Sequence, residues 1–187
     1  MKVLQTDIEG VVVIEPELFE DSRGYFFESF SEREFCEKVC NTHFVQDNES
    51  RSIYGVVRGL HFQRPPHTQS KLVRITKGRV LDIAVDIRYG SPTFGKYVAV
   101  ELSEENRRQC FIPKGFAHGF VVLSEEVVLQ YKCDDYYAPK SECSIAWNDP
   151  DIGIDWKIDE SDIILSAKDM ENPLLSDLEP IFDYNDR

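Results

Sequence analysis

Short apolar runs separated by turn residues fill the chain from about position 10 to position 147 and limit the folds it can adopt. The runs include VVVI at 11–14, GVVRGLHF from 55, KLVRI from 71, VLDIAVDI from 80, YVAVEL from 97 and VVLQY from 127. The turns KGR, YGSP and PKG lie between them. Short strands with tight turns predict an all-β sandwich or barrel. They disfavour a βαβ nucleotide-binding fold, because its parallel strands need long crossovers.

The clearest alternation of apolar and polar side chains lies in the strand expected at 80–88. One face carries Leu81, Ile83, Val85 and Ile87, and the other carries Asp82, Ala84, Asp86 and Arg88. A period of two is typical of a half-buried strand. We therefore expect the first face to meet the core and the second to meet water or a ligand.

One helix is predicted after Ser31. Ser31 and Glu34 have the spacing of a capping box, and Phe35 and Val39 form an apolar pair four residues apart. We expect this helix to cover an end of the β unit. The length of 187 residues favours one domain over 1–187, with a tail of about 149–187 packed on the core.

Charge and composition exclude several classes of protein. The 21 basic and 34 acidic residues leave a net charge of −13, which disfavours binding to nucleic acids and anionic lipid surfaces. No run approaches the ~20 apolar residues of a membrane span, and the N-terminal segment lacks a signal-peptide pattern, so we expect a cytoplasmic protein. The five cysteines include no CxxC pair, so neither a disulfide framework nor a thiolate zinc site is indicated.

Candidate catalytic side chains concentrate in GVVRGLHFQRPPHTQSKLVRITKG. A lone histidine is more often structural, but His61 lies in an apolar strand, and a proline-rich turn could bring Lys71 back beside it. An imidazole base and an ammonium together could remove an acidic C–H next to a carbonyl and stabilise the enolate oxygen. Tyr131 could equally be a core aromatic residue, and Asp169 a solvated turn carboxylate. Spacing alone shows only that suitable groups exist.

The segment PKGFAHGF resembles the second motif of the cupin superfamily, with Pro113, Gly115 and His118 at the pattern positions. This resemblance implies an all-β cupin-type jelly roll of two antiparallel sheets with a few short peripheral helices. Metal-binding cupins carry H-x-H in their first motif, whereas the corresponding residues here are His61, Phe62 and Gln63. Glutamine is a poor transition-metal ligand, so we expect no metal site.

A closer resemblance covers about residues 10–173. The matching motifs are DSRGYFFESF, FVQDNESRS, GVVRGLHFQ, KLVRITKGRVLDIAVDIRYGSPTFG, FIPKGFAHGFVVLS, YKCDDYYAP, WNDPDIGIDW and LSAKDMENP. They are similar to those of the dTDP-4-dehydrorhamnose 3,5-epimerase family. The resemblance implies an isomerase that inverts C3 and C5 of dTDP-4-dehydro-6-deoxy-D-glucose to give dTDP-4-dehydro-L-rhamnose, without cofactor or metal.

The resemblance also implies roles for individual residues. His61 is the expected base, Asp169 the carboxylate that orients it, Tyr131 the acid, and Lys71 the group that stabilises the C4 enolate. The implied contacts to the dTDP-linked 4-keto-6-deoxyhexose are Arg23, Glu28, Gln46, Asp47, Asn48, Arg58, His118, Glu142 and Lys168. The family exchanges N-terminal strands in a homodimer, so Arg23 and Glu28 are expected to serve the partner's site.

The sequence leaves three alternative functions open. A family member that inverts only C3 or only C5 would keep the same base and acid. A sugar-nucleotide-binding cupin without activity would keep the arginines and lose the base or the acid. A metal-dependent cupin oxygenase would need a ligand where Gln63 stands.

Overall fold

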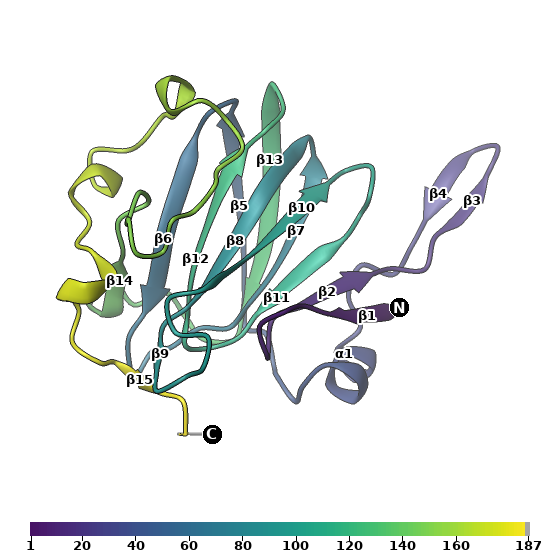
Figure 1. Cartoon of the computed structure of the whole chain (residues 1–187). Helices are drawn as coiled ribbons and strands as arrows, with labels where there is room; N and C mark the ends of the chain where they lie inside the picture. Colours follow the sequence, from purple (N-terminus) through teal and green to yellow (C-terminus); the bar gives the residue numbers. More distant parts are fainter. Residues whose placement is uncertain (186–187) are drawn as a thin grey trace.

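The computed structural model describes residues 1–185, and its main feature is a pair of antiparallel β-sheets that face each other (Figure 1). The six-stranded sheet has the order β1 (Lys2–Gln5), β2 (Val12–Glu15), β11 (Gln109–Ile112), β7 (Lys71–Lys77), β13 (Glu126–Cys133) and β5 (Gln46–Ile53). The five-stranded sheet has the order β10 (Tyr97–Ser103), β8 (Arg79–Asp86), β12 (Phe116–Val122), β6 (Val57–Gln63) and β14 (Glu142–Ser144). The prediction of an all-β fold with two antiparallel sheets is confirmed.

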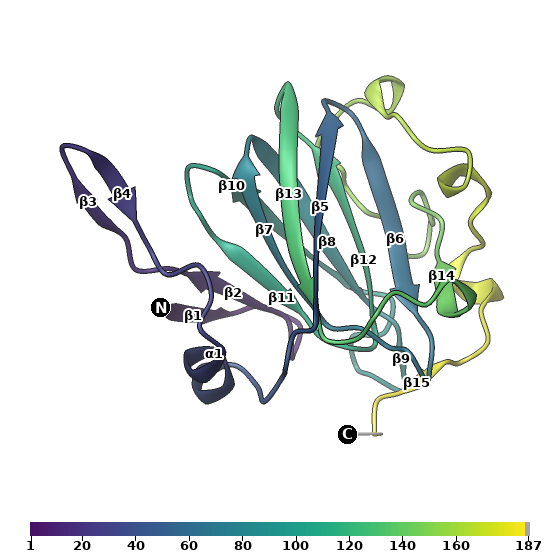
Figure 2. The same ribbon diagram turned by 180° about the vertical axis from the view of Figure 1, so that it is seen from behind.

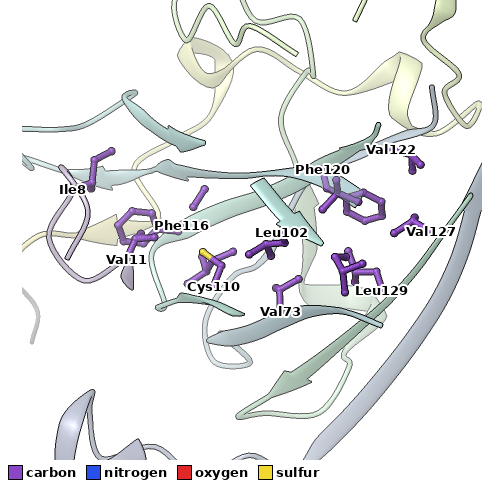
Figure 3. Packing of buried hydrophobic residues seen from close by; sticks show 14 residues of the cluster. Ile8, Val11, Val73, Leu102, Cys110, Phe116, Phe120, Val122, Val127 and Leu129 are labelled. Carbon is purple, nitrogen blue, oxygen red and sulfur yellow. The ribbon is translucent and has the colours of Figure 1, made fainter. Parts of the chain in front are cut away.

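The main core lies between the two sheets. Inward-facing residues of β7, β13 and β11 meet those of β8, β12 and β10 (Figure 3), among them Val73, Leu129, Cys110, Ala84, Phe120 and Leu102. All six are at most 4% exposed. Burying side chains from both sheets in one layer is the main stabilising contribution expected of a sandwich.

A second apolar layer covers the outer face of the five-stranded sheet. Segments after β14 cross this face (Figures 1 and 2) and bring Ile152 and Trp156 against Leu81, Ile83 and Val85 of β8. The tail contains the short 3-10 helices η2 (Glu160–Asp162), η3 (Asp169–Glu171) and η4 (Leu175–Asp177), after η1 (Pro139–Ser141).

The prediction of a half-buried strand at 80–88 needs correction. Asp82 is 1% exposed and Asp86 0% exposed, so the polar face of β8 does not meet water. This face turns toward the inside of the sandwich, while the tail buries the apolar face. Asp86 is held there by hydrogen bonds from Arg88, Ser91 and Thr93. Burial on both faces is possible because each carboxylate has a polar partner.

The predicted helix forms as α1 (Glu32–Lys38), and the Ser31 side chain accepts a hydrogen bond from the Glu34 backbone N–H. It covers the outer face of the six-stranded sheet rather than an end of the β unit. Phe35 is buried there, with its ring 5.2 Å from that of Phe111 in β11. The helix lies on this face because Phe111 belongs to the side of β11 that the inter-sheet core leaves uncovered.

Two smaller strand pairs lie outside the sandwich. β9 (Arg88–Tyr89) pairs with β15 (Phe182–Asp183), and β3 (Phe19–Asp21) pairs with β4 (Gly24–Phe26). The β3–β4 hairpin projects away from the rest of the molecule in both views (Figures 1 and 2). Across residues 1–185, no helix has both the length and the apolar character that a bilayer crossing requires.

Candidate active site

A cavity of about 650 Å³ lies between the two sheets. Strands of both sheets and the segment 164–169 line it, and its polar lining residues include Asn48, Arg58, His61, Lys71, His118, Tyr131, Glu142, Lys168 and Asp169. An adjoining cavity of about 380 Å³ shares Asn48, His61, Lys71, Tyr131 and Glu142 and adds Gln46 and Tyr137. Most of the predicted site residues therefore meet at one place.

His61 and Asp169 form a hydrogen-bonded pair in this cavity. Nε2 of His61 lies 2.6 Å from Oδ1 of Asp169, and the Ser166 hydroxyl donates to Oδ2 of Asp169 at 2.9 Å. Burial raises the pKa of Asp169, but the hydrogen bonds from His61 and Ser166 outweigh this effect and hold the pKa below its usual value. An ionised carboxylate only accepts, so Nε2 of His61 carries the hydrogen and Nδ1 is the nitrogen that can take a proton.

Lys71 and Tyr131 reach the same cavity from the six-stranded sheet. Nζ of Lys71 donates to the backbone carbonyl of His61 at 3.5 Å and lies 6.0 Å from the centre of the Tyr131 ring. Burial lowers the pKa of Lys71, and nearby Cys133 and Asp82 partly oppose this shift. Burial raises the pKa of the Tyr131 hydroxyl, which keeps it protonated at neutral pH. His61 comes from the five-stranded sheet, so base and phenol enter from opposite walls.

His118 forms a second histidine–carboxylate pair, with Asp82 of β8. Nε2 of His118 lies 2.7 Å from Oδ1 of Asp82, and both side chains are buried. Burial lowers the pKa of His118, although Asp82 acts to raise it. Asp82 was not among the residues predicted for the site. Its place on the polar face of the strand at 80–88 was the signal that could have found it.

Two glycines let β6 and β12 approach closely between the two histidines. His61 and His118 are partners in the register of these strands. A Cβ on Gly59 would lie 2.6 Å from Cα of Gly119, and one on Gly119 would lie 2.8 Å from the carbonyl oxygen of Arg58. These positions exclude a side chain. The glycines of RGLH and AHGF thus allow β6 and β12 to pack closely beside the two histidines.

A cationic side chain, Lys168, and an acidic side chain, Glu142, form an ion pair at the rim of the cavity. Nζ of Lys168 lies 2.7 Å from Oε2 of Glu142, and the Tyr137 hydroxyl donates to the same oxygen at 2.9 Å. Burial raises the pKa of Glu142, but the hydrogen bonds from Lys168 and Tyr137 lower it overall. Nε of Arg58 donates to the Ser52 hydroxyl at 3.1 Å. Arginine and lysine placed this way can bind phosphate oxygens.

The predicted contacts on β5 divide between its two faces. Gln46 and Asn48 are hydrogen-bonded to each other at 3.0 Å and line the cavities. Asp47 points the other way and forms an ion pair with Lys132 at 2.9 Å on the outer side of the sheet. The structure therefore does not place the Asp47 side chain with the other candidates. The period of two along a strand accounts for this separation.

Arg23 and Glu28 also lie apart from the cavity of their own chain. Arg23 is in the turn between β3 and β4 and forms an ion pair with Asp21 at 2.5 Å. Glu28 follows β4 and is exposed. Phe19, Tyr25 and Phe26 of the same hairpin are 58%, 56% and 68% exposed. The hairpin projects away from the two sheets (Figure 2), and neither Arg23 nor Glu28 lines the cavity that contains His61.

Gln63 occupies the position that a histidine ligand has in metal cupins. It is 6% exposed, and its amide bonds to the backbone of His67, in the turn after β6, and of Ala138, in the loop before η1. Within residues 1–185, no three side chains of His, Cys, Asp or Glu are grouped as metal ligands would be. The donor set at this position is an amide already engaged in hydrogen bonds. It does not fit the metal site of other cupins.

The sequence profile of the dTDP-4-dehydrorhamnose 3,5-epimerases matches residues 5–177. The chain belongs to this family. An Escherichia coli dTDP-4-dehydrorhamnose 3,5-epimerase is 54% identical over 171 residues, which cover 90% of this chain and 91% of that protein. This identity and coverage show dTDP-4-dehydrorhamnose 3,5-epimerase activity for the chain.

Solved structures of family members agree in fold. The dTDP-6-deoxy-D-glucose-3,5-epimerase of Legionella pneumophila, in complex with dTDP-4-keto-L-rhamnose, is 49% identical, with a TM-score of 0.94 and 98% of both chains covered. A 3′-monoepimerase from Streptomyces bikiniensis, in complex with dTDP-quinovose, is 34% identical, with a TM-score of 0.84, covering 91% of this chain and 86% of that one. The chain is thus more similar to these 3,5-epimerases than to this monoepimerase.

Proposed function

We infer that the protein inverts C3 and C5 of dTDP-4-dehydro-6-deoxy-D-glucose and so produces dTDP-4-dehydro-L-rhamnose. The observation that carries this inference is the convergence of the His61–Asp169 pair, Lys71 and Tyr131 on one cavity from two facing sheets. Inversion at carbon needs a base and an acid on opposite sides of the sugar ring. The two walls of the sandwich supply one each.

The reaction begins with proton removal next to the ketone. The protons on C3 and C5 are acidic because each carbon is adjacent to the C4 carbonyl. Nδ1 of His61 takes the proton, and the C–H electron pair moves toward the C4 oxygen. The Lys71 ammonium stabilises the negative charge on that oxygen. Asp169 stabilises the imidazolium that forms, as the third member of a triad does.

Protonation from the other wall completes each inversion. Tyr131 donates its hydroxyl proton to the carbon from the face opposite His61. Protonated His61 and deprotonated Tyr131 remain, so each must exchange a proton with solvent before the next inversion. The same groups then act at the second carbon. The ketone already makes both protons acidic, and the sequence of steps transfers no electrons to a redox partner.

The substrate's dTDP portion lies across the rim of the cavity. Arg58 and Lys168 neutralise the diphosphate, while Gln46 and Asn48 offer amide groups to the nucleoside. The chain has a net charge of −13, so these cationic side chains form a local positive site that attracts the anionic diphosphate. His118 contributes an imidazole fixed by Asp82 to the sugar end of the site.

We propose that the working form is a homodimer in which each β3–β4 hairpin reaches the partner's site. The hairpin presents three exposed aromatic side chains and Arg23 outside its own sandwich. An apolar group of this kind on a projecting arm is typical of an interface. Arg23 and Glu28 would then complete the nucleotide site of the partner. A single domain over 1–187 and a cytoplasmic location stay predictions from the sequence.

Proton NMR in D₂O tests the reaction directly. The purified protein is incubated with dTDP-4-dehydro-6-deoxy-D-glucose while deuterium is followed at C3 and C5, and a parallel sample is coupled to the downstream reductase with NADPH. Deuterium at both carbons and a reducible product support the 3,5-epimerase. Exchange at one carbon alone would indicate a single-site epimerase, and no exchange would contradict the proposal.

A further inference from the structure

Three glutamine side chains hold one short stretch of loop beside the active site. The stretch is residues 135–138, between β13 and η1, and the glutamines are Gln46 at the start of β5, Gln63 at the end of β6 and Gln69 before β7. Each of the four loop residues has one backbone group bonded to a glutamine amide. Backbone groups bond mainly to other backbone groups, which account for about two-thirds of protein hydrogen bonds, whereas this loop relies on side-chain amides at four successive residues.

Gln63 makes two of these four contacts and a third to the turn between β6 and β7. Its Nε2 donates to the carbonyl oxygens of His67 at 2.7 Å and Tyr136 at 3.2 Å. Its Oε1 accepts from the backbone N–H of Ala138 at 2.7 Å. Together these bonds need a side chain with two N–H donors on one terminal atom and an acceptor oxygen on the other. A buried glutamine meets this requirement, whereas an ionised glutamate or an apolar side chain of similar length does not.

The other two glutamines fix the residues on either side. Nε2 of Gln69 donates to the carbonyl of Asp135 at 2.7 Å. Oε1 of Gln46 accepts from the backbone N–H of Tyr137 at 3.0 Å. The backbone of the loop is therefore held on both sides of Tyr137, although the Tyr137 side chain itself is 53% exposed.

Tyr137 connects this loop to the rim of the cavity. Its hydroxyl donates to Glu142 at 2.9 Å, and Glu142 forms an ion pair with Lys168 at 2.7 Å. Tyr137 also lines the cavity of about 380 Å³ that contains His61 and Lys71. A shift of the loop backbone would move this hydroxyl out of reach of Glu142. It would leave His61 and Lys71 in place, because β6 and β7 hold them.

We propose that Gln63 is a positioning residue for dTDP-sugar binding, which acts by holding loop 135–138 so that Tyr137 meets Glu142 at the rim. Gln69 supports the same loop to a lesser degree. The inference rests on the proposed function, since it concerns affinity for the substrate of that reaction. Gln63, at the position where metal-binding cupins have a histidine ligand, would then hold a loop in place.

Gln63→Met tests the proposal by removing all three hydrogen bonds at nearly constant length. We expect the KM for the dTDP-sugar and the Kd for dTDP alone to rise about tenfold, a factor that one or two such bonds can supply. We expect kcat to stay within about twofold, because the base, acid and ammonium lie on strands. A fall in kcat with unchanged KM would overturn the proposal. Gln130→Met is the matched control, because Gln130 bonds Glu49 on the outer face of β13.

A double-mutant cycle separates this role from a general loss of stability. If Gln63 acts through Tyr137, then Gln63→Met should raise the Kd for dTDP in the wild-type background but hardly at all in a Tyr137→Ala background. Equal effects in both backgrounds would contradict the proposal. If Gln63→Met fails to fold, Gln69→Met removes one bond at a less buried position. It should raise the Kd in the same direction by a smaller factor.

Gln63→Glu adds a readout in pH. An ionised glutamate would face two carbonyl oxygens, whereas a protonated one could still donate to one of them. The ratio of its KM to that of the wild type should therefore be larger at pH 8 than at pH 6, and a constant ratio would count against the inference. Wild-type protein that does not exchange the C3 and C5 protons would instead refute the proposed function. Wild-type turnover with unchanged dTDP binding in Gln63→Met would refute the loop role alone.

Discussion

Nε2 of His61 lies 2.6 Å from Oδ1 of Asp169, although 108 positions separate the two residues in the chain. Asp169 begins the short helix η3 in the tail that follows β14. The hydroxyl of Ser166 binds its second oxygen. The C-terminal segment therefore supplies the partner of His61, and under the proposed mechanism this segment must fold for the base to be oriented.

Replacing Asp169 tests its role in orienting the base. Asp169→Asn keeps the size of the side chain and removes the charge that stabilises the His61 imidazolium. We expect kcat to fall by about 10²-fold or more. Turnover is measured beside the melting temperature, and Asp162→Asn on the neighbouring helix η2 is the control. An Asp169→Asn enzyme with normal kcat would remove this carboxylate from the mechanism.

Tyr131→Phe separates proton removal from inversion. Without the phenol, His61 can still remove a proton and return it, or a deuteron, to the same face. We expect inversion to fall by about 10²–10⁴-fold, with a smaller loss in the rate of deuterium exchange at C5 in D₂O. Both rates come from one NMR experiment. If exchange and inversion fall by the same factor, Tyr131 is not the opposite-face acid.

Lys71→Met removes the ammonium beside the C4 oxygen. We expect kcat to fall by about 10²–10³-fold, the cost typical of losing one group that stabilises an oxyanion. Burial disfavours the charged lysine and lowers its pKa, so an apolar side chain should leave the melting temperature unchanged or raise it. Loss of activity through unfolding of Lys71→Met would contradict this expectation.

The wild-type kcat should also depend on the charge of Lys71. Because burial lowers the pKa of Lys71, the ammonium is lost, and kcat falls, at a lower pH than for an exposed lysine. A pH profile of kcat measures this.

The buried His118 predicts a dependence of stability on pH. Burial lowers its pKa below 6.5 in the folded protein, so the unfolded chain binds this proton first as the pH falls. Stability from this residue is complete above pH 6.5 and decreases as the pH falls through that value toward the lower folded pKa. His118→Asn should make the melting temperature depend less on pH in the range below pH 6.5. An unchanged slope would show that His118 does not titrate in this range.

Mixing two inactive variants tests whether the hairpin serves the partner subunit. Arg23→Ala keeps His61 but loses the arm's arginine, and His61→Ala keeps the arm but loses the base. Refolded together, they should form mixed dimers in which one site has both groups, so activity at low substrate concentration should reappear. Each variant refolded alone is the control. No recovery, despite mixed dimers seen by native mass spectrometry, would place Arg23 outside the partner's site.

Patterns between near neighbours in the sequence predicted much of this molecule. Alternation over 80–88 predicted a strand, and the Ser31 cap predicted helix α1. His61 and Lys71 stood out because their chemistry suits enolate formation, and a resemblance of long motifs placed Tyr131 and Asp169 beside them. Each of these signals depends on residue type and short spacing, which are visible without a fold.

Other features depend on residues that are distant in the chain. The pairing of His118 with Asp82 and the burial of both faces of β8 require the sheets and the tail to be in place. Asp47 turned away from the site because register fixes which face of β5 meets the cavity. Hydrogen bonds and desolvation act over a few ångströms, so the environment of these carboxylates is set by three-dimensional packing rather than by sequence spacing.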